Sequence, residues 1–354
     1  MKIATLLLLC LTIFPLPASA ADTQKSWGFY PLPVVARSPE TGLMLGIASV
    51  LWDTAGNPQV PRQNLLMFEA VYTTRNQLAL RLGIDRLLWA EKFRLETELA
   101  YSRFPDLFFG IGPEADAEED YTPVEFHAQG SLGRALASQL YLGPAWDFKH
   151  SAIRDKEAGG LLAAGTIPGS EGAWYAGGGA RLVLDNRDSA VAPRRGLYLT
   201  ARSLLYGQSG AGGDLFMQSE LDARGYFSVL PRQVTALRSV LVLSAGDLCF
   251  QAMPLVGGPF LMRGYYQGRY RDADMLVFQA EQRFQIFWRL GGVLFGSLGR
   301  VAPSAPELVR GVFRAAGGGG LRFTLDEKTG FKLRVDLGCS SEGPGLYIGS
   351  LEAF

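Results

Sequence analysis

Residues that could perform acid-base or metal chemistry are scarce in this chain of 354 residues. Its only histidines are His127 and His150, and it contains no paired histidine spacing, no cysteine cluster, no Gly-x-Ser-x-Gly turn and no phosphate-binding loop. A hydrolase could still combine a serine with one of these histidines, because the members of a catalytic triad need not be close in sequence. We expect ordinary wall or loop histidines, no enzymatic activity, no metal and no cofactor.

Two further groups of residues could react or bind ions. Cys249 and Cys339 could form one disulfide bond in an oxidising compartment, and two unpaired cysteines are the alternative. A run of acidic residues could bridge cations to lipopolysaccharide, although a solvated loop is the simpler interpretation. The run comprises Glu114, Asp116, Glu118, Glu119 and Asp120.

The elements that must hold these residues alternate between apolar and polar positions. In one segment the even positions are Leu276, Phe278, Ala280, Gln282, Phe284, Ile286 and Trp288, and the odd positions include Gln279, Glu281, Arg283 and Gln285. A period of two predicts a β-strand with two different faces. A dry core would not accept the charged face, because buried unpaired charge is costly, whereas a water-filled lumen accepts it. The alternation recurs at residues 78–85, 93–101, 215–227 and 331–337.

This pattern predicts an all-β fold, a transmembrane antiparallel β-barrel of sixteen strands. Closure of a barrel satisfies every backbone group within lipid. The first strand is the least regular, because Pro31 and Pro33 lack the N–H that a strand donates to its neighbour. The strands are expected near residues 27–36, 41–52, 63–74, 77–88, 92–104, 122–134, 137–149, 172–185, 195–206, 213–228, 233–246, 274–288, 289–300, 311–325, 329–341 and 344–354.

The predicted connections differ in length at the two ends of the barrel. The brief turns include residues 89–91, 135–136 and 229–232, and the long connections are residues 105–121, 151–171 and 247–273. Short periplasmic turns and long extracellular loops are typical of outer-membrane barrels. We therefore predict that the long connections lie outside the cell.

The first residues of the sequence predict export. Residues 1–20 contain one lysine, an apolar run from Leu6 to Leu16 and an Ala-Ser-Ala end, which is the pattern of a secretory signal peptide. Residues 21–354 would then form one barrel domain in the bacterial outer membrane, and no later stretch reaches the 18 apolar residues of a membrane helix. Lys and Arg number 34, as do Asp and Glu, so nothing favours nucleic acid as a partner.

Four segments resemble the BamA and TamA superfamily, also called the bacterial surface antigen family. They are Arg263-Gly264-Tyr265 with Glu281, PLPVVARSPETGLMLG at residues 31–46, DNRDSAVAPRRGLY at residues 185–198, and GLYIGSLEAF at residues 345–354. The resemblance implies a sixteen-stranded barrel whose sixth extracellular loop carries the Arg-Gly-Tyr motif. The strand count from alternation puts residues 247–273 at that position.

In that family the loop folds back into the lumen, and its arginine pairs with acidic residues of the barrel wall. The resemblance therefore implies a latch in which Arg263 meets Glu281, since a guanidinium held by a carboxylate fixes geometry as well as charge. Ser297 stands where the family often has an aspartate, so the implied latch is one salt bridge with a hydroxyl contact. The alternative is that Arg263 is a solvated loop arginine.

The same resemblance implies two further motifs. The first is a periplasmic turn motif, which comprises Asp185, Arg187, Asp188, Pro193 and Gly196. The second is a C-terminal assembly signal, which comprises Tyr347, Gly349 and Phe354. Glu352 departs from this signal, because a hydrophobic residue is common at that position. A terminal strand with one apolar face would explain Phe354 without any receptor.

The resemblance also implies a function and a set of partners. Relatives that insert or secrete proteins usually carry periplasmic POTRA modules, for which this sequence has no room, so a separate periplasmic partner is the expected replacement. The expected role is to help insert or translocate proteins, with the seam between the first and last strands as the working element. A passive pore or structural membrane protein is the alternative. Outer-membrane lipids, lipopolysaccharide and the barrel assembly machinery, for the chain's own insertion, are the remaining expected partners.

Overall fold

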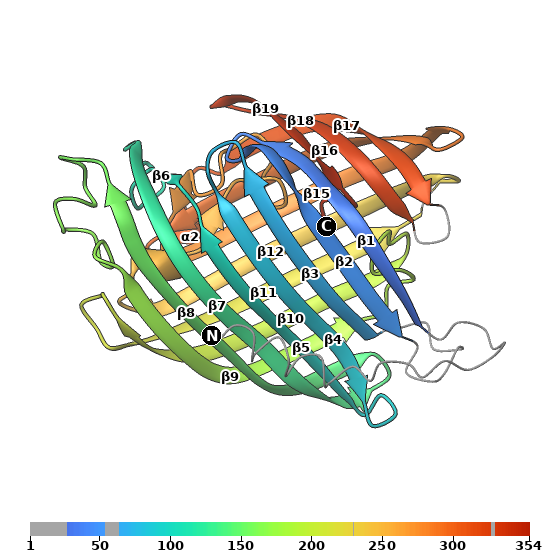
Figure 1. Cartoon of the computed structure of the whole chain (residues 1–354), viewed down its shortest axis with the longest axis horizontal. Coiled ribbons are helices and arrows are strands. Elements are labelled where there is room, and N and C mark those ends of the chain that lie inside the picture. The colour runs from blue at the N-terminus through green and yellow to red at the C-terminus, as the bar shows by residue number, and fades with distance from the viewer. Residues whose placement is uncertain (1–26, 54–63, 229, 327–329) are drawn as a thin grey trace.

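The alternating segments form a closed antiparallel barrel in the computed structural model, which describes residues 27–53, 64–228, 230–326 and 330–354 (Figure 1). Within these residues the predicted count of sixteen barrel strands is confirmed. The predicted signal peptide, residues 1–20, lies outside them. The barrel strands are β1 (Trp27–Ser38), β2 (Gly42–Asp53), β3 (Asn64–Thr73), β4 (Leu78–Leu88), β5 (Phe93–Arg103), β7 (Glu119–Ala137), β8 (Leu140–Lys156), β9 (Ala173–Asp185), β10 (Gly196–Ser209), β11 (Leu215–Phe227), β12 (Gln233–Gly246), β15 (Asp274–Phe287), β16 (Leu290–Ala302), β17 (Arg314–Asp326), β18 (Phe331–Ser340) and β19 (Gly343–Ser350).

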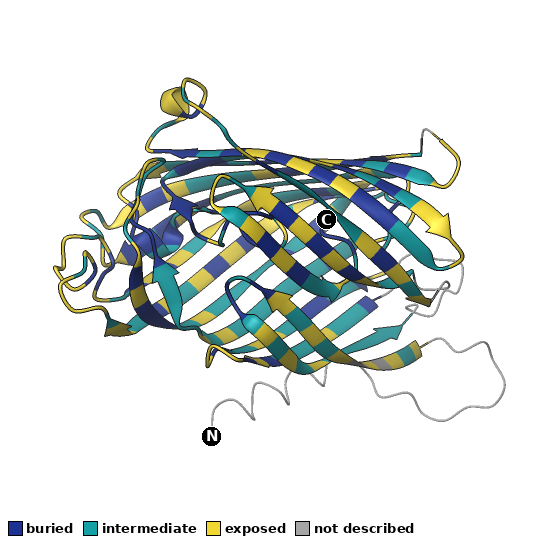
Figure 2. Cartoon of the chain, turned by 90° about the horizontal axis from the view of Figure 1, so that it is seen from above, coloured by how far each residue is buried: buried dark blue, intermediate teal, exposed yellow. Residues whose placement is uncertain are grey.

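The wall has one exposed apolar face and one buried charged face. In β18, Leu333, Val335 and Leu337 are exposed, whereas Arg334 and Asp336 between them are buried. Figure 2 shows the same banding of exposed and buried positions along many strands. Because successive side chains of a strand point to opposite sides, the apolar positions face the surrounding lipid and the charged positions face the interior.

The barrel closes where β1 meets β19. β1 pairs with β2 over twelve residues, from Trp27 to Ser38. Its register with β19 is a single pair, Arg37 with Ile348. The first and last strands are therefore joined by far fewer residue pairs than any two barrel strands that follow each other in sequence.

Several short elements lie outside the sixteen-strand pattern. β6 (Asp106–Phe108) pairs with the start of β7, and β13 (Leu255–Val256) pairs with β14 (Tyr270–Arg271) in the connection after β12. That connection also contains the 3-10 turn η1 (Phe250–Ala252), and α2 (Ala305–Leu308) follows β16. These elements span two to four residues, too few to show a periodicity in sequence. No helix among the described residues is both long and apolar enough to cross a bilayer.

The last strand is shorter than predicted. The sequence predicted a strand over residues 344–354, but β19 ends at Ser350. Leu351 adopts a left-handed backbone conformation with φ 62°, which breaks the extended chain. Residues 351–354, here called the tail, therefore leave the wall.

Candidate functional site

The connection between β12 and β15 contains the segment 257–273, here called the arginine loop, which packs against the inner side of the wall. Its apolar side chains Met262, Tyr265 and Tyr270 join a buried cluster with Val277 of β15 and Val301 of β16. The pairing of β13 with β14 closes the base of the loop. Apolar burial of this kind stabilises the docked position of the loop in addition to its polar contacts.

Arg263 lies at the centre of these polar contacts and is 2% exposed. Its Nη2 donates to Oε1 of Glu281 on β15, and its Nη1 donates to Oδ2 of Asp336 on β18 at 2.5 Å. The guanidinium also lies 3.6 Å from the ring centroid of Phe295. The structure thus brings Arg263 and Glu281 together, as the resemblance implied, and adds a second carboxylate.

The hydroxyl contact that the resemblance implied between Ser297 and Arg263 is wrong. The Ser297 hydroxyl donates to the carbonyl of Ala316 at 3.4 Å, and Asp336 takes the position at Arg263 instead. The alternation of β18 already marked Asp336 as inward-facing. The sequence does not show which inward-facing carboxylates lie next to the loop, because that depends on closure of the barrel.

The backbone of the Arg-Gly-Tyr motif is held by β18 and β19. The N–H of Gly264 donates to the Tyr347 hydroxyl at 2.9 Å, and the Ser340 hydroxyl donates to the Gly264 carbonyl at 2.7 Å. The hydroxyl of Tyr265 lies 3.0 Å from that of Ser341. Gly264 has φ 119°, and a Cβ there would lie 2.9 Å from backbone atoms of Cys339, so only glycine fits without displacement.

The tail enters the interior rather than completing a terminal strand. Phe354 packs with Tyr226 and Ala236, and its carbonyl accepts a hydrogen bond from Nη2 of Arg283 at 2.7 Å. Tyr347, which the resemblance assigned to the C-terminal assembly signal, is buried on the inner face against Gly264. Of the three predicted signal residues, Phe354 therefore lies outside any strand, and only Tyr347 and Gly349 lie in β19.

Glu352 connects the tail to the basic residues of the wall. Its carboxylate accepts hydrogen bonds from Nε of Arg322 and Nζ of Lys332, both at 2.8 Å, and lies 3.8 Å from Nε of Arg283. Burial by itself raises the pKa of Glu352, but the cations of Arg283, Lys332 and Arg322 lower it to about 2. The residue that departs from the family pattern is thus an ionised partner inside the barrel.

Ion pairs link the arginine loop to the tail. Glu281, which holds Arg263, also accepts from Nε of Arg283 at 2.7 Å. Asp336 also accepts from Nη1 of Arg322 at 2.5 Å, and Arg322 contacts Glu352. Each of the three carboxylates therefore contacts at least two cations, which offsets the cost of burying the charges.

The predicted periplasmic turn motif lies between β9 and β10. Arg187 donates from Nε to Asp185 at 2.9 Å and stacks on the ring of Tyr198 at 4.4 Å. Asp188 accepts from the backbone N–H of Arg194 at 2.9 Å, which closes the turn. Gly196 has φ 107°, a conformation that favours glycine.

Pro193, the remaining member of the turn motif, is buried and lines a cavity at this end of the barrel. The cavity is bounded by several turns and by Glu352 of the tail. The turn motif therefore contributes to a recess that the sequence did not reveal.

The possible disulfide bond between Cys249 and Cys339 is absent from the structure, in which both cysteines are free. Cys249 is buried in a cluster with Tyr206 and Phe216, whereas Cys339 is exposed on the apolar face of β18. The two thiols lie on opposite sides of the wall, so closure of the barrel keeps them apart.

The two histidines occupy different environments. His127 lies 2.7 Å from Asp147, which also accepts from the Tyr206 hydroxyl at 3.0 Å, and His150 is exposed. Among the described residues no group of His, Cys, Asp and Glu has an arrangement suited to a metal ion.

A closed sixteen-stranded barrel with an apolar outer surface and a charged interior defines a transmembrane barrel of the outer-membrane class. The model of the Omp85 superfamily domain matches residues 70–326, and the chain belongs to that superfamily. No curated protein matches the chain.

Three solved structures have folds similar to that of this chain. BamA from Haemophilus ducreyi lacking POTRA domains 1-3 aligns with a TM-score of 0.59 at 13% identity, over 93% of this chain and 71% of that one. CdiB from Escherichia coli aligns with a TM-score of 0.58 at 12% identity, over 94% of this chain, and CdiB from Acinetobacter baumannii with 0.56 at 13% identity, over 93%. The chain spans 63% and 60% of the lengths of these two CdiB chains. At these identities the likeness concerns the fold.

Proposed function

We propose that this barrel assists the insertion or translocation of proteins at the outer membrane, and that the seam between β1 and β19 is its working element. The observation that carries the proposal is the pairing of these strands at a single register position, Arg37 with Ile348, against twelve positions between β1 and β2. A ladder with few hydrogen bonds costs less to open than a full one. Membership of the Omp85 superfamily supports a general role in insertion or secretion.

Two sequence features keep the seam short. β19 ends at Ser350 because the chain turns at Leu351, so the tail offers no ladder to residues 31–34 of β1, which the antiparallel register would place opposite it. Pro31 and Pro33 in that stretch lack backbone N–H donors. In this proposal an opened seam exposes strand edges, to which an incoming strand can pair.

The arginine loop has a separate role in the proposal, which is to close the lumen as a latched plug. Arg263 holds the loop between Glu281 on β15 and Asp336 on β18. In this proposal the short-turn end of the barrel faces the periplasm, and a separate periplasmic protein delivers the polypeptides. The chain itself reaches the outer membrane by export through the signal peptide of residues 1–20.

A reversible cross-link across the seam tests the proposal. The variant Arg37→Cys/Ile348→Cys, in a Cys249→Ser/Cys339→Ser background, joins β1 to β19 when oxidised. The control Val35→Cys/Leu45→Cys joins β1 to β2, which the proposal keeps paired. The readout is the rate at which a small unrelated β-barrel folds into liposomes that contain the protein.

We expect oxidation of the seam variant to abolish the acceleration of client folding, reduction to restore it, and the control to be active in both states. An oxidised seam variant as active as the reduced one would disprove the role of the seam.

A further inference from the structure

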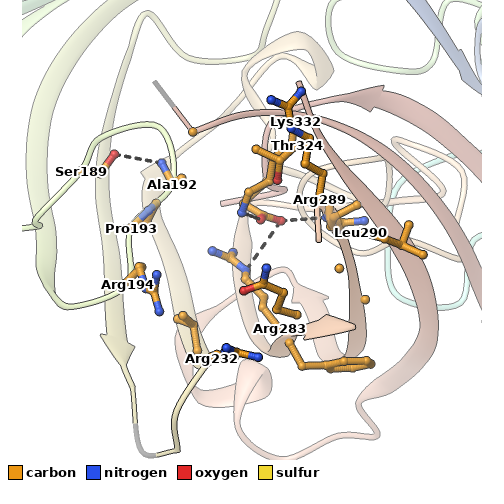
Figure 3. A pocket seen from close by; sticks show the side chains of 18 of the residues that line it. Ser189, Ala192, Pro193, Arg194, Arg232, Arg283, Arg289, Leu290, Thr324 and Lys332 are labelled. Carbon is orange, nitrogen blue, oxygen red and sulfur yellow. Dashed lines mark hydrogen bonds and ion pairs between the residues drawn. The ribbon is translucent and has the colours of Figure 1, made fainter. Parts of the chain in front are cut away.

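A cavity of about 540 Å³ lies at the short-turn end of the barrel, among the turns that follow β9, β11 and β15 and the tail (Figure 3). Its lining carries two acidic residues, Asp188 and Glu352. Its six basic residues are Arg194, Arg232, Arg283, Arg289, Arg322 and Lys332. Six cations against two carboxylates leave four positive charges in excess in a recess of the barrel interior.

Both carboxylates of the lining are already engaged. Asp188 accepts backbone N–H groups of Arg194 and Arg195 at 2.9 and 3.2 Å, within its own turn. Glu352 is held by Arg322 and Lys332 at 2.8 Å. Neither carboxylate has a described contact with Arg232, so the rim of the cavity keeps its positive potential.

Arg283 contributes a buried positive charge to the lining of the cavity. It is 7% exposed and lines the cavity, and its Nε and Nη2 donate to Glu281 and to the carbonyl of Phe354. In the described part of the chain its buried Nη1 has no hydrogen-bond partner. The guanidinium of Arg283 is therefore fixed in place by the wall and the tail, and its positive charge adds to the potential of the cavity that it lines.

We propose that this cavity binds an acidic segment of a polypeptide that reaches the barrel from the short-turn end. The cations come from several turns and strands rather than from one point, and the volume accommodates several carboxylates. A positively lined recess with low-dielectric walls concentrates anions from solution. The inference deepens the proposed function, on which it rests for the orientation of the barrel.

The position of the charges favours a polypeptide over a membrane lipid. Arg283, Arg322 and Lys332 lie on the inward-facing side of their strands, where they contact the tail. Lipid headgroups lie outside the wall, so a lipid would have to leave the bilayer to reach these residues. A soluble chain entering the mouth of the barrel meets no such barrier.

Binding of a labelled oligoglutamate peptide to the full barrel in neutral detergent tests the inference, with fluorescence anisotropy as the readout. An oligoglutamine peptide of equal length, inorganic phosphate and phosphatidylglycerol micelles serve as comparison ligands. The variant Arg232→Gln/Arg289→Gln removes two cations of the cavity without touching those that hold Glu352. The control Arg310→Gln removes an exposed arginine in the connection after α2, at the opposite end of the barrel.

We expect oligoglutamate to bind, oligoglutamine not to bind, and the double variant to weaken oligoglutamate binding roughly tenfold, while the control leaves it unchanged. Added salt should weaken the binding as well. No binding of oligoglutamate, or binding that the double variant does not change, would overturn the inference. Displacement of the peptide by phosphatidylglycerol or phosphate at lower concentration would reassign the site to phosphate groups. The assay does not depend on client insertion, so its failure would leave the role of the seam intact.

Discussion

At the scale of single residues, the interior is organised by buried charges that share partners. Arg263 is enclosed by Glu281, Asp336 and the ring of Phe295. Removal of one partner of a buried ion pair leaves the other charge uncompensated, which costs more than the pair contributes. Single substitutions here should therefore have effects that reach beyond one hydrogen bond.

Removal of the latch should change conductance. We expect the wild-type barrel to show low, flickering single-channel conductance in a planar bilayer, and Arg263→Ala and Glu281→Ala to raise it, because the arginine loop loses its anchor. Arg181→Ala is the matched control, since Arg181 pairs with Glu96 away from the loop. Large, steady conductance that is indifferent to both latch substitutions would favour a simple pore.

Because the pKa of Glu352 is lowered, we expect the free energy of unfolding to depend on pH. Its pKa of about 2 lies below the ordinary value of 4.5, so its stabilisation is full above pH 4.5 and is lost as the pH falls towards 2. Glu352→Gln should lower the free energy of unfolding by about 3 kcal/mol at neutral pH. Urea titrations of both proteins in micelles should converge near pH 2. A difference that persists unchanged at that pH would contradict the assignment.

At the scale of elements, docking of the arginine loop depends on close backbone approach. A Cβ at Gly264 would lie 2.9 Å from backbone atoms of Cys339, and one at Gly338 would lie 2.7 Å from the carbonyl carbon of Arg263. The glycines at these two positions let the loop lie directly on β18. Neither the hydrogen bond to Tyr347 nor the ion pairs of Arg263 could form at a larger separation.

Gly264→Ala should therefore undock the loop. The alanine would be strained by more than about 1 kcal/mol at φ 119° and would clash with β18, so protease cleavage within residues 257–273 should become faster. Gly296→Ala is the control, because a Cβ there meets nothing within 4 Å. Equal cleavage rates in both variants and wild type would show that the loop tolerates the change.

At the scale of the whole molecule, closure of the sheet separates two chemical environments. The apolar face of each strand meets lipid, and the charged face meets the interior. The same separation keeps the two cysteines apart, because Cys249 is buried inside the barrel and Cys339 is exposed on the apolar surface. It also brings β15, β18 and the tail to one network of ion pairs.

Thiol labelling tests this arrangement. An apolar maleimide should label Cys339 in the folded barrel and spare Cys249, and both should react after unfolding, because only Cys339 is exposed. Mass spectrometry without reductant should find Cys249 and Cys339 both as free thiols. A mass lower by two hydrogens, or rapid labelling of Cys249 in the folded state, would contradict the structure.

The strands of the barrel wall could be predicted from the sequence alone. Alternation with a period of two is a local property, so sixteen strands, their faces and the long and short connections could be predicted from neighbouring residues. Resemblance supplied the pairing of Arg263 with Glu281. The short elements β6, β13 and β14 were not predicted, because two or three residues carry no periodicity.

The contacts inside the barrel follow only from the tertiary structure. The contact of Arg263 with Asp336, the inward turn of the tail and the cations around Glu352 join residues that are distant in sequence. Alternation shows that such residues face inward, but not which of them meet across the lumen. That choice depends on the register and closure of the sheet, which position every inward-facing side chain relative to all the others.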